Sequence, residues 1–186
     1  MRSPIEEVTD PEECYQQGAM YFGKADYKNA VAFFEKAANM GHMYGKFYLG
    51  TCYQQGVGVG QDIEKAIQLY TESGDAGNIG AYISVAQIYD MGTGIEADHK
   101  KAAQYFAKLP MVPYASYRLG MYYYQGDGVE QDYAKAFQLL SQSESGQFGE
   151  AFYYLGECYA NGYGTDKDEA KAAECFAKAK SLGYEG

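Results

Sequence analysis

Apolar residues in this chain recur at helical spacing, in short runs that are separated by glycine-rich turns. A typical run has an alanine followed three and four positions later by large apolar residues, as in Ala66, Leu69 and Tyr70. Residues spaced in this way lie on one face of an α-helix. The same pattern returns at Ala102 and Ala136. The hydrophobic pattern therefore predicts a series of amphipathic helices.

The turn before each of these helices contains Gly-x-Gly, first as GVGVGQD from Gly56. Further copies begin at Gly92, Gly126 and Gly162, so the spacings are 36, 34 and 36 residues. A phosphate-binding glycine loop normally occurs once, between a strand and a helix, whereas a fixed period of this length indicates a repeat array. We therefore interpret the glycines as hinges between helices, where the backbone needs positive φ angles and helix ends approach closely.

An aspartate stands four residues before each repeat alanine, and the alanine series includes an earlier copy at Ala30. A short acidic residue just ahead of an apolar helical run is typical of an N-cap. A metal site is the alternative, but aspartates on separate repeats are too far apart to share an ion. The predicted N-caps are Asp26, Asp62, Asp98, Asp132 and Asp168.

A second helix precedes each turn, in the segments FYLGTCYQQG, ISVAQIYDMG, YRLGMYYYQG and YYLGECYANG. The unit is therefore helix A, a Gly-x-Gly turn and helix B. Glycines that follow helix B are expected to end it in the left-handed conformation. These glycines are Gly41, Gly77, Gly146 and Gly183.

The combined pattern Ala-x3-Leu-Gly-x2-Tyr-x2-Gly-x-Gly-x3-Asp-x3-Ala resembles the Sel-one-like repeat, a relative of the tetratricopeptide repeat, and residues 115–136 match it without a gap. Residues 12–41 resemble a plain tetratricopeptide unit with a shorter turn. The resemblance implies an all-α fold, a right-handed α-α superhelix (solenoid) of about five helix-turn-helix repeats. The expected boundaries are an N-terminal tail at 1–11, a tetratricopeptide-like repeat at 12–43, and Sel-like repeats at 44–79, 80–113, 114–149 and 150–186.

One link departs from the pattern, because AKLPMVPYA after Phe106 is two residues shorter than its counterparts. Pro110 is expected to stop the preceding helix, and Pro113 can begin the next at its first turn. A linker between two domains is the alternative. We favour one continuous array because the repeat resumes within two residues.

Composition narrows the functional classes. The net charge of −10 and the lack of a basic stripe argue against a nucleic-acid partner. The N-terminus does not resemble a signal peptide, and no apolar run is long enough to cross a bilayer. Four cysteines form no C-x-x-C pair, which favours reduced thiols and a cytoplasmic location. They are Cys14, Cys52, Cys158 and Cys175.

Candidate catalytic motifs are weak. GAMYFGKA lacks the hydroxyl residue that a phosphate loop needs, and GTGIEA follows a predicted helix and not a strand. His42 and His99 fall in different repeats, without cysteines at metal-ligand spacing. We therefore expect no catalysis, no cofactor and no metal. The alternative is a hydrolase or β-lactam-binding protein like cysteine-rich secreted relatives, although Ser-x-x-Lys, Lys-Thr-Gly and regular cysteine pairing are absent.

The resemblance implies a protein-interaction scaffold or adaptor with a concave groove lined by the A helices. One helical stripe that is expected to face the groove is formed by Tyr114, Tyr117, Met121 and Tyr124. Leu119 of the same helix is expected to face the core. The full set of expected groove residues is Tyr15, Phe22, Tyr44, Phe47, Gln54, Ile83, Gln87, Asp90, Tyr114, Tyr117, Met121, Tyr124, Tyr153 and Glu157.

The charges near this groove indicate the kind of partner. Asp90 and Glu157 favour a peptide that carries basic residues beside apolar anchors. The last helix, AAECFAKAKSL, is apolar on more than one side. A partner, a second copy or a further segment is expected to cover it, so self-association through the C-terminal repeat is a further possibility.

Overall fold

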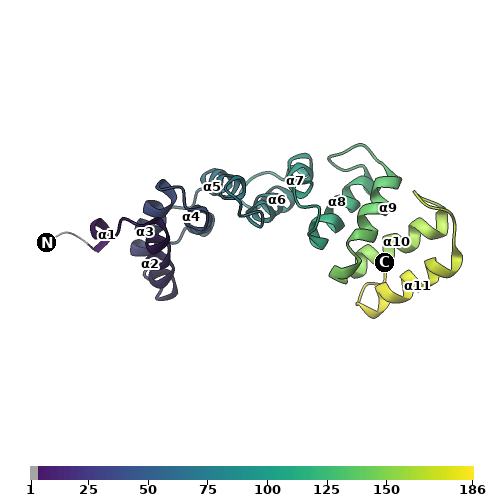
Figure 1. Ribbon diagram of the computed structural model, residues 1–186. Helices are drawn as coiled ribbons and strands as arrows, with labels where there is room; N and C mark the ends of the chain where they lie inside the picture. Colours follow the sequence, from purple (N-terminus) through teal and green to yellow (C-terminus); the bar gives the residue numbers. More distant parts are fainter. Residues whose placement is uncertain (1–3) are drawn as a thin grey trace. The chain divides into compact units, whose positions relative to one another are not determined.

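The computed structural model describes residues 4–186, and every regular element among them is helical (Figure 1). From α2 onward the helices follow one another as five helix-turn-helix hairpins, which confirms the predicted fold class. Of the expected N-terminal tail, residues 1–3 lie outside the described part. The helices are α1 (Pro4–Glu7), α2 (Pro11–Gly23), α3 (Tyr27–Asn39), α4 (Met43–Gln55), α5 (Ile63–Asp75), α6 (Ala81–Met91), α7 (His99–Phe106), α8 (Pro113–Gln125), α9 (Tyr133–Gln142), the 3₁₀ turn η1 (Glu144–Gly146), α10 (Gly149–Asn161) and α11 (Glu169–Ser181).

The chain divides into two compact units. The first contains Met1–Ile88 and Thr93–Ile95, and the second contains Tyr89–Gly92 and Glu96–Gly186. The proline-containing link between α7 and α8 lies inside the second unit, so it is not a boundary between units. As predicted, α7 ends before Pro110 and Pro113 occupies the first turn of α8.

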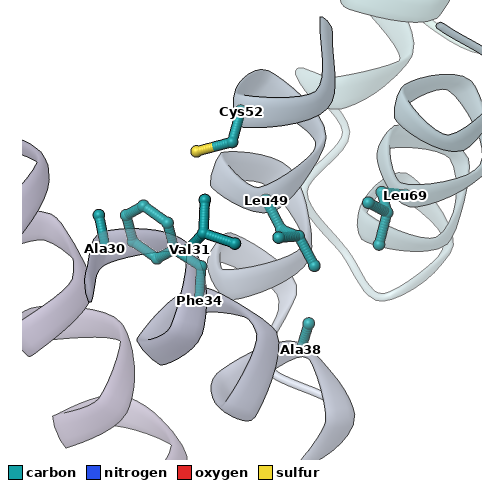
Figure 2. Packing of buried hydrophobic residues seen from close by; sticks show 7 residues of the cluster. All are labelled: Ala30, Val31, Phe34, Ala38, Leu49, Cys52 and Leu69. Atoms are coloured by element: carbon teal, nitrogen blue, oxygen red, sulfur yellow. The ribbon is translucent and has the colours of Figure 1, made fainter. Parts of the chain in front are cut away.

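The core of the first unit forms where α4 packs against α3. Val31 and Phe34 of α3 face Leu49 and Cys52 of α4 in Figure 2. Leu69 of α5 completes this cluster, and its residues are all nearly inaccessible to solvent. Burial of each such side chain stabilises the fold by about 1.5–3 kcal/mol, so packing between consecutive hairpins holds this unit together.

The core of the second unit also forms where consecutive hairpins pack against each other. Leu140 of α9 packs with Ala151 and Leu155 of α10 and with Ala179 of α11. Two residues of α8 that the sequence analysis placed in a groove also belong to this cluster. Their burial is described below with the candidate surfaces.

The predicted N-caps are confirmed. In each B helix the side chain of the capping aspartate accepts a hydrogen bond from the main-chain amide three residues later, at 2.9 Å for Asp62 and 3.0 Å for Asp132. The hydrogen bond from the main-chain amide of Lys101 lowers the pKa of Asp98, and equivalent hydrogen bonds from Lys135 and Lys171 lower the pKa values of Asp132 and Asp168. Because these pKa values are lowered in the folded state, the stabilisation is present at neutral pH and is lost as the pH falls through them.

The second glycine of each Gly-x-Gly turn lies against the first turn of the preceding B helix. Gly58 has a φ of +72° and Gly128 a φ of +69°. A Cβ atom on Gly128 would lie 2.5 Å from the main-chain carbon of His99. Only glycine therefore suits both the backbone conformation and the close approach. The hinge interpretation of the glycines fits this geometry.

Three of the four glycines predicted to end a B helix have positive φ, namely Gly41, Gly77 and Gly183. The prediction for Gly146 is wrong. There the left-handed residue is Gln147, with a φ of +54°, because the short turn η1 intervenes and delays the reversal by one residue.

Candidate protein-binding surfaces

An aromatic surface lies on the A helices of the first unit. We define the α2–α4 aromatic face as Tyr15, Phe22, Tyr44, Phe47 and Tyr48. The ring centroids of Tyr15 and Tyr44 are 5.8 Å apart, and Tyr48 lies 5.8 Å from Tyr15 and 5.4 Å from Phe47. Four of the rings are partly buried, whereas Tyr44 is 41% exposed. The face therefore presents aromatic area to solvent on a rigid helical support.

The structure brings together the rings of four predicted groove residues, Tyr15, Phe22, Tyr44 and Phe47, around that of Tyr48, which was not predicted. Its ring bridges the two helices, because it also lies 6.4 Å from Phe22 and stacks on Phe34 of α3 at 5.4 Å. The spacing of four residues between Tyr44 and Tyr48 was the available signal.

His42 packs against Tyr15 and Tyr44 of this face. Its ring stacks on Tyr15 at 5.0 Å, and its Nδ1 accepts a hydrogen bond from the amide of Gly45 at 3.1 Å. The proton of a neutral ring is then on Nε2, which lies 2.9 Å from Glu12 Oε2 and can donate to it. A carboxylate is thereby fixed beside the aromatic rings.

The remaining predicted residues of the first unit are partly buried. Gln54 Oε1 accepts a hydrogen bond from the buried hydroxyl of Tyr70 at 2.7 Å, so this amide supports the hairpin. Ile83 and Gln87 lie on α6 and are half-buried. A groove continuing from these residues into the second unit stays a prediction.

Two residues of the stripe on α8 are buried, so the expectation that they face an open groove is wrong. Tyr117 is 9% exposed and Met121 is 3% exposed. The reason is the next hairpin: Phe148 stacks on Tyr117 at 4.9 Å, and the Tyr117 hydroxyl donates to Glu150 Oε2. Met121 packs into the cluster around Leu155. Burial raises the pKa of Tyr117, and its hydrogen bond to Glu150 adds to this effect.

Asp90 was expected to attract a basic partner, and this expectation is also wrong. Its side chain is 6% exposed, and Oδ1 lies 2.5 Å from Nη2 of Arg118. The Tyr122 hydroxyl donates to the same oxygen, and the guanidinium lies over the Tyr122 ring at 5.5 Å. Burial lowers the pKa of Arg118, but the hydrogen bond and charge of Asp90 outweigh burial and raise the pKa above its ordinary value. The negative charge of Asp90 is therefore already paired with the positive charge of Arg118 within the second unit.

The other predicted residues of the second unit pack against neighbouring rings while staying partly exposed. Tyr114 lies 6.0 Å from Phe148, and Tyr124 lies 4.8 Å from Tyr154. Tyr153 contacts rings on α11 and in the C-terminal segment. Glu157 is half-buried, and its main-chain oxygen accepts a hydrogen bond from Asn161 at 3.0 Å.

A hollow beside the B helices α7 and α9 was not predicted. It has a volume of about 800 Å³ and is lined by Lys100, Tyr123, Lys135, Gly126 and the segment Gly128–Asp132. A smaller hollow of about 240 Å³ adjoins it over Leu119.

Candidate chemistry is sparse in the part of the chain that the structure describes. No group of three or more His, Cys, Asp or Glu side chains there is arranged to hold a metal ion. None of the described helices combines the length and the apolar character that crossing a membrane requires. The four cysteines are free thiols, and three of them are buried. His99 is used in packing, with its ring stacked on Tyr122 at 5.4 Å.

The repeats identified from sequence and structure match a known family. The model of the Sel1 repeat matches residues 13–42, 44–78, 80–109, 113–145 and 149–184. The chain belongs to the Sel1 repeat family. The first match includes the hairpin with the shorter turn, which the sequence analysis compared with a tetratricopeptide unit. Sel1 repeat proteins are generally protein-interaction scaffolds, and their fold is typically not enzymatic.

Solved structures of Sel1 repeat proteins share this fold. The protective antigen c5321 of uropathogenic Escherichia coli has a TM-score of 0.84 at 29% identity, over 94% of this chain and 38% of that one. A Sel1 repeat protein of Oxalobacter formigenes has a TM-score of 0.78 at 24% identity, over 94% of this chain and 74% of that one. The second likeness shows the fold alone.

A curated relative, the Beta-lactamase HcpA of Helicobacter pylori, is 39% identical over 57 residues. The match covers 31% of this chain and 23% of the relative, so it extends over fewer than two of the five repeats.

Proposed function

We propose that this Sel1 repeat protein is a non-catalytic adaptor that binds a protein partner through the α2–α4 aromatic face. The contiguous, partly exposed rings of that face are the observation that carries the proposal. Tyrosine and phenylalanine lose little rotational freedom on binding and offer large contact areas, which is why aromatic residues are enriched at binding hot spots. Glu12 beside Tyr15 and the net charge of −10 favour a partner segment with basic residues next to apolar anchors.

The Tyr44→Glu variant is expected to lose its partner without losing its fold. Tyr44 is 41% exposed, so its replacement removes contact area from the binding face and adds a charge, while the core stays intact. The immobilised chain is used to capture proteins from a lysate of the source organism. The amount of captured partner protein, measured by quantitative mass spectrometry, should be at least about tenfold lower for the variant than for the wild type. Its melting temperature should stay within about 3 °C of the wild type.

Met20→Glu is the matched control, because Met20 is also 41% exposed and also lies on an A helix of the first unit, outside the aromatic face. It should capture the same proteins as the wild type. Equal capture by Tyr44→Glu, or equal loss in both variants, would rule out the aromatic face as the binding surface.

A β-lactam-binding or hydrolytic role is the second candidate, and the match to Beta-lactamase HcpA is the observation that favours it. The cysteine-rich secreted relatives named as the alternative have regularly paired cysteines, whereas the cysteines of this chain are free in the structure. Reduced thiols also support the proposal of a cytoplasmic location. Thiol chemistry therefore distinguishes the two candidates.

The native protein is expected to react slowly with a thiol reagent, and the denatured protein should yield all four thiols without added reductant. Burial raises the pKa of Cys52 to about 11 and that of Cys158 to about 12. At pH 8 about one thousandth of Cys52 is then in the reactive thiolate form. Fewer than four thiols in denaturant would indicate disulfides and would favour the β-lactam-related candidate, which acylation by a fluorescent penicillin would then test.

A further inference from the structure

One contact between consecutive hairpins contains a smaller side chain than the equivalent contacts. In the first, second and fourth hairpins, the residue that follows the repeat alanine of helix B is large. These three residues are Val31, Ile67 and Phe137, and none of them is exposed. In the third hairpin the same position is Ala103 of α7. The contact between α7 and α8 therefore has less side-chain volume than its counterparts.

The contact between α9 and α10 shows what a large residue does at this position. The ring of Phe137 on α9 lies 5.3 Å from the ring of Tyr159 on α10, edge to face. Tyr123 of α8 occupies the same position in its A helix as Tyr159 does in α10. A ring equivalent to Phe137 would therefore lie beside Tyr123, but Ala103 does not supply one.

The hollow of about 240 Å³ lies at this place, because both Ala103 and Tyr123 line it. Its other lining residues are mostly small or apolar, namely Lys100, Gln104, Ala107, Leu119, Gly128 and Val129. Lys100 is the one charged residue among them, and within the described residues its ammonium group forms no ion pair. The hollow therefore suits an apolar ring that has a carboxylate next to it.

Two further hollows continue from this one along α8. The larger, of about 800 Å³, shares Lys100 and Tyr123 with it, and a third, of about 100 Å³, shares Leu119. The lining residues of α8 extend from Ser116 to Tyr123, which is about 10 Å along a helix. An extended chain covers that length with about three residues. The connected hollows therefore favour a segment of protein chain over a single small molecule.

The charges of the larger hollow limit where an acidic group can bind. Asp132 and Glu130 line this hollow together with Lys135. Asp132 is already paired with Lys135 at 3.5 Å, and Glu130 is exposed and would repel a carboxylate. The favourable place for an acidic group of a partner is therefore beside Lys100, which lines both hollows.

We infer that these hollows form one binding site, the α7–α9 trough, for an extended segment of a protein partner that carries a phenylalanine next to an acidic residue. The ring enters the hollow beside Ala103, in the place that Phe137 occupies in the next hairpin. The carboxylate pairs with Lys100, and apolar residues follow over Leu119. The trough lies in the second unit and accepts an acidic segment, so it is independent of the α2–α4 aromatic face, which is proposed to bind a basic one.

Two fluorescein-labelled peptides test the inference with the full-length protein. Their sequences are Gly-Gly-Glu-Phe-Val-Ala-Gly-Gly and its reverse, because an extended chain can lie in the trough in either direction. Fluorescence anisotropy should show that at least one of them binds with a Kd below about 1 mM. In the peptide that binds, replacing the phenylalanine by alanine should weaken binding at least about tenfold.

The Ala103→Phe variant should weaken binding of the same peptide at least about tenfold, because its own ring then occupies the hollow as Phe137 does next to Tyr159. Its melting temperature should be no lower than that of the wild type, since the new ring adds apolar packing. Ala103→Val introduces the side chain of Val31 and is the second variant if the larger ring prevents folding. It should weaken binding at least about threefold.

Lys100→Glu should weaken binding at least about fivefold, because it replaces an attraction by a repulsion. Lys28→Glu is the matched control: Lys28 is exposed at the same position of α3, where Val31 takes the place of Ala103. It should change the affinity less than about twofold.

The inference is overturned if neither peptide binds, if folded Ala103→Phe binds as tightly as the wild type, or if Lys28→Glu weakens binding as much as Lys100→Glu. It is likewise overturned if light scattering shows a concentration-dependent dimer that Ala103→Phe abolishes, because a second copy would then occupy the trough.

Discussion

The free energy of unfolding of the Gly58→Val variant is expected to be at least about 3 kcal/mol lower than that of the wild type. Gly58 has a φ of +72°, and a Cβ atom there would overlap the main-chain oxygen of Tyr27. Valine would therefore add backbone strain to an overlap with main-chain atoms that cannot rotate away. Urea denaturation followed by circular dichroism measures the loss.

Gly60→Val in the same turn is the control. Gly60 lies outside the set of positive-φ glycines, and a Cβ atom there would meet nothing within 4 Å. Its free energy of unfolding should stay within about 1 kcal/mol of the wild type. ATP should not shift the melting temperature of the wild type. An ATP-induced shift that Gly58→Val abolished, with unchanged stability, would instead identify a nucleotide site.

The Arg118→Met variant is expected to lose about 3–5 kcal/mol of stability, since it leaves a buried carboxylate without its cation. Asp90 Oδ1 lies 2.5 Å from the guanidinium, and the Asp90 side chain is 6% exposed. Methionine preserves most of the length of the side chain, so the loss of charge pairing dominates. Chemical denaturation measures the change.

Two variants make this prediction specific. The double variant Arg118→Met with Asp90→Asn should recover at least half of the loss, because it removes both buried charges while the amide oxygen can still accept from Tyr122. Lys101→Met breaks an exposed pair, 3.6 Å from Asp98, and should cost less than about 1 kcal/mol. Equal losses in Arg118→Met and Lys101→Met would contradict the role of burial.

The repeat architecture could be predicted from the sequence because its signals are local. The side chain of an N-cap aspartate such as Asp132 accepts a hydrogen bond from an amide three residues away, and a glycine such as Gly126 is required by the positive φ angle of its own residue. Neither depends on residues far along the chain. The helices, their caps and their turns therefore followed from short segments, and the period showed that the segments belong to one family of hairpins.

The binding surfaces could be predicted only in part, because helix A contacts neighbouring hairpins on more than one side. Tyr15 and Tyr117 occupy the same position in their helices, yet Tyr15 stays partly exposed and Tyr117 is buried under Phe148. Helical spacing identifies the face of a residue but not the size of the side chain that the next hairpin places over it.

The sequence by itself thus determined the Sel1-like helical hairpins, the N-cap aspartates of their B helices and the aromatic character of the A helices. Only the tertiary structure decided which polar and aromatic groups are available. Asp90 is paired with Arg118, which is 28 residues away in the chain, and Tyr117 is buried under Phe148 of the next hairpin. Both outcomes depend on contacts between hairpins, and a pattern within one hairpin carries no information about those contacts.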